Sequence, residues 1–157
     1  MKVFLGGTCS GYKWRDKLIP MLSCDYYNPI VKNWQEEDRL REVKEREEAD
    51  YVLYVITSGM KGFYSIAEVV DDSNKRPEKT LFCMLGKFWD KQVYHSLCAV
   101  RNLVKSNGVM VFEDLSDIAT FLNEMYWKDE LKPKMVDEET FKKITLELFG
   151  GDKNGNM

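Results

Sequence analysis

The chain has 157 residues, 44% of them hydrophobic and 13% aromatic, which is enough to bury the core of one domain and excludes a disordered protein. Its 23 basic and 26 acidic residues are interleaved and give a net charge of −3, which argues against a nucleic acid polymer as partner. No apolar run approaches the length of a membrane span and the first residues do not form a signal peptide, so we expect no membrane partner and a cytoplasmic location.

Short apolar runs alternate with amphipathic stretches along the sequence. The apolar runs predict strands at residues 2–6, 25–28, 51–56, 79–85 and 109–112. The amphipathic stretches predict helices at residues 14–22, 36–48, 65–72, 90–106 and 116–126, of which 36–48 is charged enough to be mostly solvated. This alternation predicts an α/β fold, a flavodoxin-like three-layer αβα sandwich whose five-stranded parallel sheet has the order 2-1-3-4-5.

Three regions follow from this pattern. Residues 1–126 form the predicted α/β domain. Residues 127–149 are a charged linker with an amphipathic helix at 137–149, and residues 150–157 are a tail rich in Gly and Asn that we expect to be mobile.

The predicted strand order places the first and third strands side by side, so the loops at 7–13 and 57–65 share one crevice. The first loop contains Gly6, Gly7 and Gly11, which fit either a tight turn or a loop that approaches a ligand closely. It matches neither GxGxxG nor the P-loop pattern, so no dinucleotide or P-loop cofactor site is predicted. Arg15, just beyond the loop, either supplies positive charge to a ligand or lies on a solvated face.

Ser65 and Glu68 have the spacing of a capping box, in which each side chain satisfies the backbone of the other residue. Local pattern alone favours this interpretation. Against it stands the location, because the pair follows the central strand and the carboxyl end of such a strand is where open α/β sheets bind ligands.

Two further features concern the chemistry available. Glu42, on the charged helix, and Asp50, before the third strand, are the other candidate carboxylates. His95 is the only histidine and the four cysteines form no CxxC pair, so we predict reduced thiols, no metal site and no cofactor. Chemistry in this chain is therefore expected to use carboxylates. Asn28, before Pro29, fits an Asx turn better than a ligand contact.

With these residues in place, the chain resembles the nucleoside 2-deoxyribosyltransferase-like proteins, a superfamily that also contains nucleoside 5′-monophosphate N-glycosidases. The resemblance extends over residues 2–126. It rests on segments 3–8, 14–15, 27–29, 48–57 and 62–68, whose sequences are ValPheLeuGlyGlyThr, TrpArg, TyrAsnPro, GluAlaAspTyrValLeuTyrValIleThr and GlyPheTyrSerIleAlaGlu.

The resemblance implies cleavage of an N-glycosidic bond of a nucleoside or nucleotide, by a hydrolase or a base-exchange transferase with a homodimeric or larger assembly. Glu68 is the implied nucleophile, and Glu42 or Asp50 would protonate the leaving base. The candidate substrate-binding residues are Gly7, Thr8, Ser10, Tyr12, Arg15, Asn28 and Ser65. Among them, Ser65 would orient Glu68.

Two alternatives stay open. One is an NAD-cleaving glycohydrolase resembling the TIR-type domains, which share the sheet topology and a catalytic glutamate. The other is a nucleotide sensor or partner-binding module without catalysis, because the usual Gly-x-Glu-Leu-Gly of the family reads Ile66-Ala67-Glu68-Val69-Val70 here.

Overall fold

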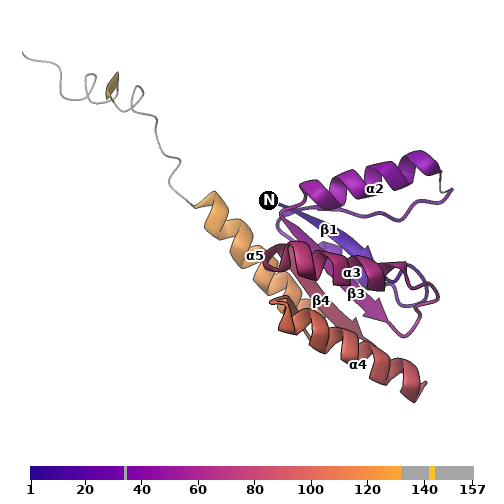
Figure 1. Ribbon diagram of the computed structural model, residues 1–157. Helices are drawn as coiled ribbons and strands as arrows, with labels where there is room; N and C mark the ends of the chain where they lie inside the picture. Colours follow the sequence, from indigo (N-terminus) through magenta and orange to yellow (C-terminus); the bar gives the residue numbers. More distant parts are fainter. Residues whose placement is uncertain (34, 132–141, 144–157) are drawn as a thin grey trace, which may run out of the picture.

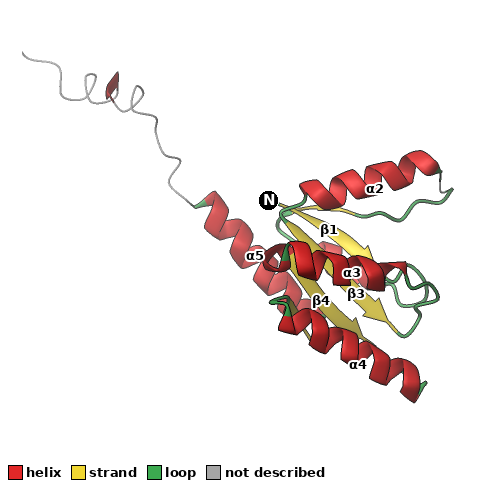
Figure 2. Ribbon diagram, in the orientation of Figure 1, coloured by secondary structure: helices red, strands yellow, loops and turns green. Residues whose placement is uncertain are grey.

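Five parallel strands form one sheet in the order β2-β1-β3-β4-β5. The computed structural model describes residues 1–33, 35–131 and 142–143 (Figure 1). The strands are β1 (Lys2–Gly7), β2 (Asp25–Tyr27), β3 (Tyr51–Thr57), β4 (Thr80–Leu85) and β5 (Met110–Phe112). Helices cover both faces of the sheet (Figure 2), so the predicted flavodoxin-like sandwich and its strand order are confirmed.

The helices follow the prediction with shifted ends. They are α1 (Trp14–Leu18), α2 (Glu36–Glu48), α3 (Tyr64–Lys75), α4 (Lys91–Ser106) and α5 (Leu115–Glu130), with short 3-10 turns at Ile19–Met21 and Pro77–Lys79. The helix predicted at 14–22 is too long, because the chain tightens into a 3-10 turn at Pro20, which has no N–H to donate. α5 runs past residue 126, and of the region predicted to be an amphipathic helix only residues 142–143 are described.

The side chains of β3 pack alternately into two separate cores, one on each face of the sheet. Leu53 and Val55 pack on one face with side chains of α1 and α5, including Trp14, which is fully buried. Tyr54 and Ile56 pack on the other face with side chains of α3 and α4. Because both faces are covered, β3 is a central strand and its apolar run lacks the alternation of a half-exposed strand.

Helix α2 is attached differently from the other long helices. None of its side chains is buried, and Leu40 is 58% exposed, as the charged sequence predicts. It is linked to the rest of the domain largely through charged side chains: Lys2 Nζ lies 2.5 Å from Glu45 Oε2, Arg46 pairs with acidic residues of α3, and the Arg41 guanidinium lies 5.6 Å from the ring centre of Tyr27. Charge pairs therefore contribute more than apolar packing to the position of α2.

Two other expectations concern the cysteines, predicted to be reduced, and the helices, none of which is expected to span a membrane. All four cysteines are free, and burial in the core raises the pKa of Cys83 to about 12. Within the described ranges, no helix is both long and apolar enough to cross a bilayer.

We expect Gly7→Ala to unfold or strongly destabilise the domain. Gly7 has φ +106°, and a Cβ there would lie 2.2 Å from the carbonyl oxygen of Val55 in β3. The strained backbone and the clash together should lower the free energy of unfolding by at least about 2 kcal/mol. Denaturant titration measures the loss. Gly62→Ala is the matched control, since nothing lies within 4 Å of its Cβ position, and an equal loss there would contradict this account.

Candidate functional site

The loops after β1 and β3 meet at the carboxyl edge of the sheet. The backbone N–H of Thr57 donates to Thr8 Oγ1 at 2.9 Å, and Ser10 Oγ donates to the carbonyl of Gly59 at 2.6 Å. A Cβ on Gly59 would lie 2.6 Å from the carbonyl oxygen of Ser10, so the close approach depends on glycine. The predicted shared crevice is confirmed.

Two cavities flank the loop after β1. One, of about 170 Å³, lies between the two loops and is lined by Gly7, Thr8, Cys9, Ser10, Met60, Lys61, Gly62, Tyr64 and Ser65. The other, of about 250 Å³, is lined by Thr8, Cys9, Gly11, Tyr12, Lys13, Trp14, Arg15, Asp16, Asn28 and Ile30. The structure thus places all of the predicted substrate-binding residues in the walls of these two cavities.

Glu68 lies one turn along α3 from Ser65 and is only 7% exposed. Its Oε1 accepts a hydrogen bond from Arg46 Nη1 of α2 at 2.5 Å. Burial raises the pKa of Glu68, the Arg46 charge opposes that rise, and the nearby carboxylates of Glu42 and Asp72 add to it. A carboxylate this deeply buried is therefore held next to a cation from another helix.

The capping-box interpretation of Ser65 and Glu68 is wrong. α3 begins at Tyr64 with Phe63 as its N-cap residue, and no side chain caps it. Ser65 is the second residue of the helix, so its hydroxyl is not at the N-cap position that a capping box requires. No hydrogen bond joins Ser65 to Glu68 in the described part of the chain, so any orienting role of Ser65 stays a prediction.

A second buried carboxylate lies behind Glu68. Asp72 is fully buried and accepts hydrogen bonds from the Tyr54 hydroxyl at 2.6 Å and from Arg76 Nε and Nη2 at 3.0 and 2.8 Å. Arg46 Nε lies 3.6 Å from Asp72 Oδ2 and is a buried donor with no hydrogen bond among the described residues. Arg46 thus stands between the carboxylates of Glu68 and Asp72.

Glu42 joins this group from α2. It is half-buried and lies one turn before Arg46. Burial raises the pKa of Glu42, while the charges of Arg46 and Arg15 oppose the rise. The Glu42 charge in turn adds to the raised pKa of Glu68, and the Arg46 charge opposes the rise in the pKa of both carboxyls.

The Arg15 guanidinium donates hydrogen bonds to backbone carbonyls. Its Nε and Nη2 donate to the carbonyl of Leu5 at 3.0 and 2.8 Å, and Nη1 donates to that of Thr8 at 2.8 Å. Desolvation lowers the pKa of Arg15 to about 10. The solvated-face interpretation is wrong: Arg15 holds the end of β1 in place and lines the cavity from below the loop.

Tyr12 and Asn28 complete the second cavity. Asn28 Oδ1 accepts from the N–H of Ile30 at 3.2 Å, which is the predicted Asx turn. The Tyr12 hydroxyl accepts from Lys17 Nζ at 3.0 Å, and the ring remains partly exposed. Both residues keep polar groups beside the cavity.

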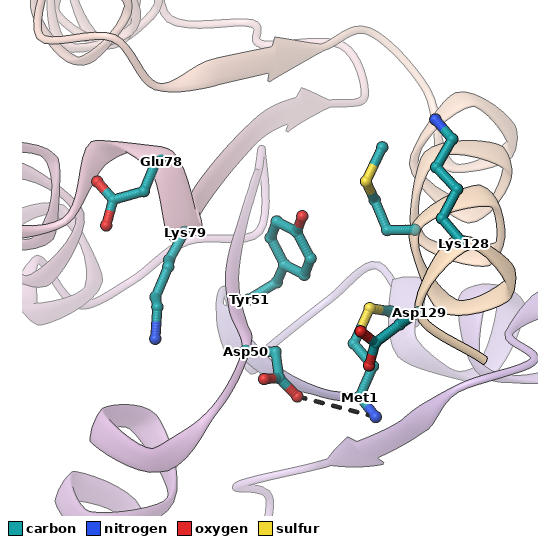
Figure 3. Close-up of a pocket in the computed structure, with 8 residues that line it drawn as sticks. Met1, Asp50, Tyr51, Glu78, Lys79, Lys128 and Asp129 are labelled. Carbon is teal, nitrogen blue, oxygen red and sulfur yellow. Dashed lines mark ion pairs between the residues drawn. The ribbon is translucent and has the colours of Figure 1, made fainter. Parts of the chain in front are cut away.

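Asp50 lies at the opposite edge of the sheet, because it precedes β3 whereas the loop with the glycines follows it. Its Oδ2 accepts from the N–H of Lys2 at 2.6 Å and lies 3.9 Å from the Met1 amine. It lines a separate cavity of about 550 Å³ with Tyr51, Glu78, Lys79, Lys128 and others (Figure 3). Asp50 is thus not brought together with Glu42 and Glu68.

Sequence reasoning missed Arg46, Asp72 and Tyr54. The available signal was spacing: Arg46 follows Glu42 by four residues and Asp72 follows Glu68 by four, so each pair shares a helix face. The charged helix was interpreted as solvated, which concealed the one arginine that points inward.

The described residues contain no group of three or more His, Cys, Asp or Glu side chains arranged to hold a metal ion. His95 lies exposed on α4. The polar groups gathered at the carboxyl edge are carboxylates, arginines, hydroxyls and backbone amides, which suit binding and acid–base or nucleophilic chemistry on a small polar molecule.

These features define an α/β protein with a carboxylate-centred site at the carboxyl edge of its sheet. A family model described as "Nucleoside 2-deoxyribosyltransferase like" matches residues 1–88, which is more than half of the 157 residues. The chain belongs to this family, as the sequence motifs predicted. The matched range includes Glu42, Glu68 and both loops of the crevice. Comparison with curated proteins gave no match.

Removing the buried carboxylate should be far more damaging than removing its exposed neighbour. Asp72→Ala would leave the Arg46 and Arg76 charges and the Tyr54 hydroxyl without their shared partner, and should lower the free energy of unfolding by about 3–5 kcal/mol. Asp71→Ala, which removes an exposed pair with Lys75, should leave stability close to that of the wild type. Denaturant titration of both variants tests this, and equal losses would refute it.

Proposed function

We propose that the chain cleaves the N-glycosidic bond of a (deoxy)nucleoside or nucleotide through Glu68. The observation that carries this proposal is the carboxylate of Glu68, buried one helical turn from a cavity at the carboxyl edge and paired with Arg46. Membership of the nucleoside 2-deoxyribosyltransferase-like family supports the substrate class.

In this mechanism the Glu68 carboxylate attacks C1′ as the base departs with the electrons of the C1′–N bond, through an oxocarbenium-like transition state. The product is a covalent glycosyl-enzyme. Water then resolves it in a hydrolase, or a second base does so in a transferase. Glu68 must be ionised to attack, so the Arg46 charge, which opposes the rise in the Glu68 pKa, supports this role.

Glu42 is the proposed acid that protonates the leaving base. Its pKa is raised by burial, which favours the protonated form that an acid requires. Asp50 is left out of this proposal because it faces the other edge of the sheet.

The cavity walls are the proposed substrate contacts. Gly7, Thr8, Ser10 and Ser65 line the cavity nearest Glu68. Tyr64 also lines it and is exposed, so its ring is available to stack on a base. Tyr12, Arg15 and Asn28 line the neighbouring cavity, although the Arg15 guanidinium is already bonded to carbonyls.

A second candidate is a nucleotide-binding module without turnover. It is favoured by the low exposure of Glu68 and by Arg46, which occupies its Oε1. Homo-oligomerisation stays a prediction of the family resemblance, which sedimentation velocity checks. A cytoplasmic location stays a prediction from the sequence.

The decisive experiment is a panel of nucleosides, nucleoside 5′-monophosphates and NAD, followed by chromatography for free base. We expect base release from at least one nucleoside or monophosphate and its loss in Glu68→Ala, because no other group would form the covalent intermediate. Glu47→Ala, which removes an exposed glutamate of α2, serves as the control. Full activity in Glu68→Ala would refute the nucleophile. Nicotinamide release alone would favour the TIR-like alternative, and thermal stabilisation without turnover would favour the binding module.

The pH profile of kcat/KM should be bell-shaped. Activity falls at acid pH as Glu68 becomes protonated, with an apparent pKa above the ordinary value of 4.5 because burial raises it. It falls at alkaline pH as Glu42 loses its proton. The mechanism requires this loss to occur above the Glu68 pKa, and burial raises the pKa of Glu42 from its ordinary value of 4.5. Glu42→Gln should lower kcat/KM about 10²-fold or more and remove the alkaline limb. An alkaline limb that persists in this variant assigns the acid to another group.

A further inference from the structure

The ion pair between α2 and α3 does more than connect two helices. We propose that Arg46 is the positioning residue for Glu68, fixing one orientation of the carboxylate and keeping it ionised, and that Asp72 in turn holds Arg46. The catalytic part of this inference rests on the proposed function of Glu68, whereas its electrostatic part does not.

The burial of the pair gives it strength. Two arginines of α2 each lie 2.5 Å from a glutamate: Arg39 from Glu36 on the same helix, and Arg46 from Glu68 on α3. The side chains of the first are 51% and 60% exposed, and those of the second are 13% and 8% exposed. Water and salt screen the first pair but reach the second poorly, so only Arg46 exerts a strong influence on its partner.

The surroundings of Arg46 fix its place. Its Nη1 bonds to Glu68, its Nε lies 3.6 Å from Asp72, and its Nη2 lies 4.0 Å from Asp71. Asp72 is itself held by Tyr54 of β3 and by Arg76. The Arg46 guanidinium of α2 is therefore surrounded by three carboxylates of α3, hydrogen-bonded to Glu68 and within ion-pair distance of Asp72, which leaves it little freedom to move away from Glu68.

The charges of this group determine the state of Glu68. Arg46 and Arg76 balance Glu68 and Asp72, while Asp71 is paired with Lys75 and Glu42 faces the group from α2. Without Arg46, Glu68 would face Glu42 and Asp72 with one cation fewer, and protonation would relieve the repulsion. A protonated Glu68 has no nucleophilic oxygen.

Arg46 would also act on the second chemical step. When the Glu68 oxygen forms its bond to C1′, the base leaves with the bonding electrons and takes a proton from Glu42, and Glu68 becomes a neutral ester. The Arg46 charge then lacks that partner. In the second step water or a second base attacks C1′ and gives its proton to the Glu42 carboxylate, while the bond between C1′ and the Glu68 oxygen breaks. Glu68 departs as a carboxylate and its pair with Arg46 is restored, so Arg46 favours breakdown of the intermediate.

A carboxyl titration separates positioning from mere helix attachment. The midpoint of the Glu68 carboxyl is followed by ¹³C NMR in the full chain labelled at glutamate, with the signal assigned by its absence in Glu68→Gln. We expect Arg46→Met to raise the midpoint by about 1–3 pH units, Arg46→Lys to raise it less, and Arg39→Met to leave it unchanged. A purely structural Arg46 would lower thermal stability without moving the midpoint, and an unchanged midpoint in folded Arg46→Met overturns the proposal.

Two further measurements keep the test open to refutation. If Arg46→Met does not fold, Arg46→Gln retains hydrogen-bond donors without charge and should give the same upward shift. In the wild type, slow rotation of the Arg46 guanidinium seen by ¹⁵N NMR should become fast in Glu68→Gln, and rotation that is fast in both proteins overturns the proposal.

The kinetic and mass measurements test the catalytic part of the proposal, whereas the NMR titration needs no substrate and tests the ion pair by itself. The acid limb of kcat/KM should move upward in Arg46→Met with the NMR midpoint, and intact-mass measurement should show more glycosyl-enzyme at steady state than in the wild type. A wild-type protein that releases no base from any nucleoside or nucleotide refutes the proposed function alone, because the NMR midpoints are measured without substrate.

Discussion

The contact on which the rest of the site depends is the buried ion pair between Arg46 of α2 and Glu68 of α3. No side chain of α2 belongs to either apolar core, so the position of Glu42 depends largely on polar contacts such as the Arg46 pair, whose side chains are 13% and 8% exposed. The pair thereby does two things at once: it holds the helix that contains one carboxylate and sets the charge of the other. Such a pair is costly to desolvate, and the hydrogen bond between Arg46 Nη1 and Glu68 Oε1 offsets part of that cost, while Asp72 beside it is satisfied by Tyr54 and Arg76.

β3 supports this arrangement through Tyr54 in its middle and through Thr57 at its carboxyl end. Its apolar residues enter both cores, and Tyr54 among them places a hydroxyl on Asp72 from inside the sheet. At its carboxyl end, Thr57 binds the glycine loop through Thr8. Gly7 lies so close to the Val55 backbone of β3 that only glycine fits there, and Gly7 and Thr8 line the cavities beside that loop. One rigid strand therefore aligns the acidic network with the walls of the site.

The sequence predicted the architecture well and the local chemistry less well. Periodicity located every strand, and strand order alone placed the two loops together, because neighbouring parallel strands end at one edge. Strand polarity also separates Asp50 from Glu68, since a residue before a strand and a loop after it lie at opposite edges. The capping box failed because helix starts depend on backbone geometry near Phe63 that a four-residue pattern does not contain. Arg46 was hidden because only tertiary contacts distinguish one inward arginine from its solvated neighbours.

α2 is attached to the domain by polar contacts, whereas α3 and α4 pack on an apolar core. Separating α2 from the sheet breaks charge pairs and removes no fully buried apolar side chain of the helix, since Leu40 already faces solvent and Val43 is only half-buried. Separating α3 or α4 exposes a core. We therefore expect α2 to unfold locally at a lower free energy than the whole domain, so that its amide hydrogens exchange while those of β3 stay protected. Raising the ionic strength should therefore mainly lower the free energy needed to separate α2 from the sheet.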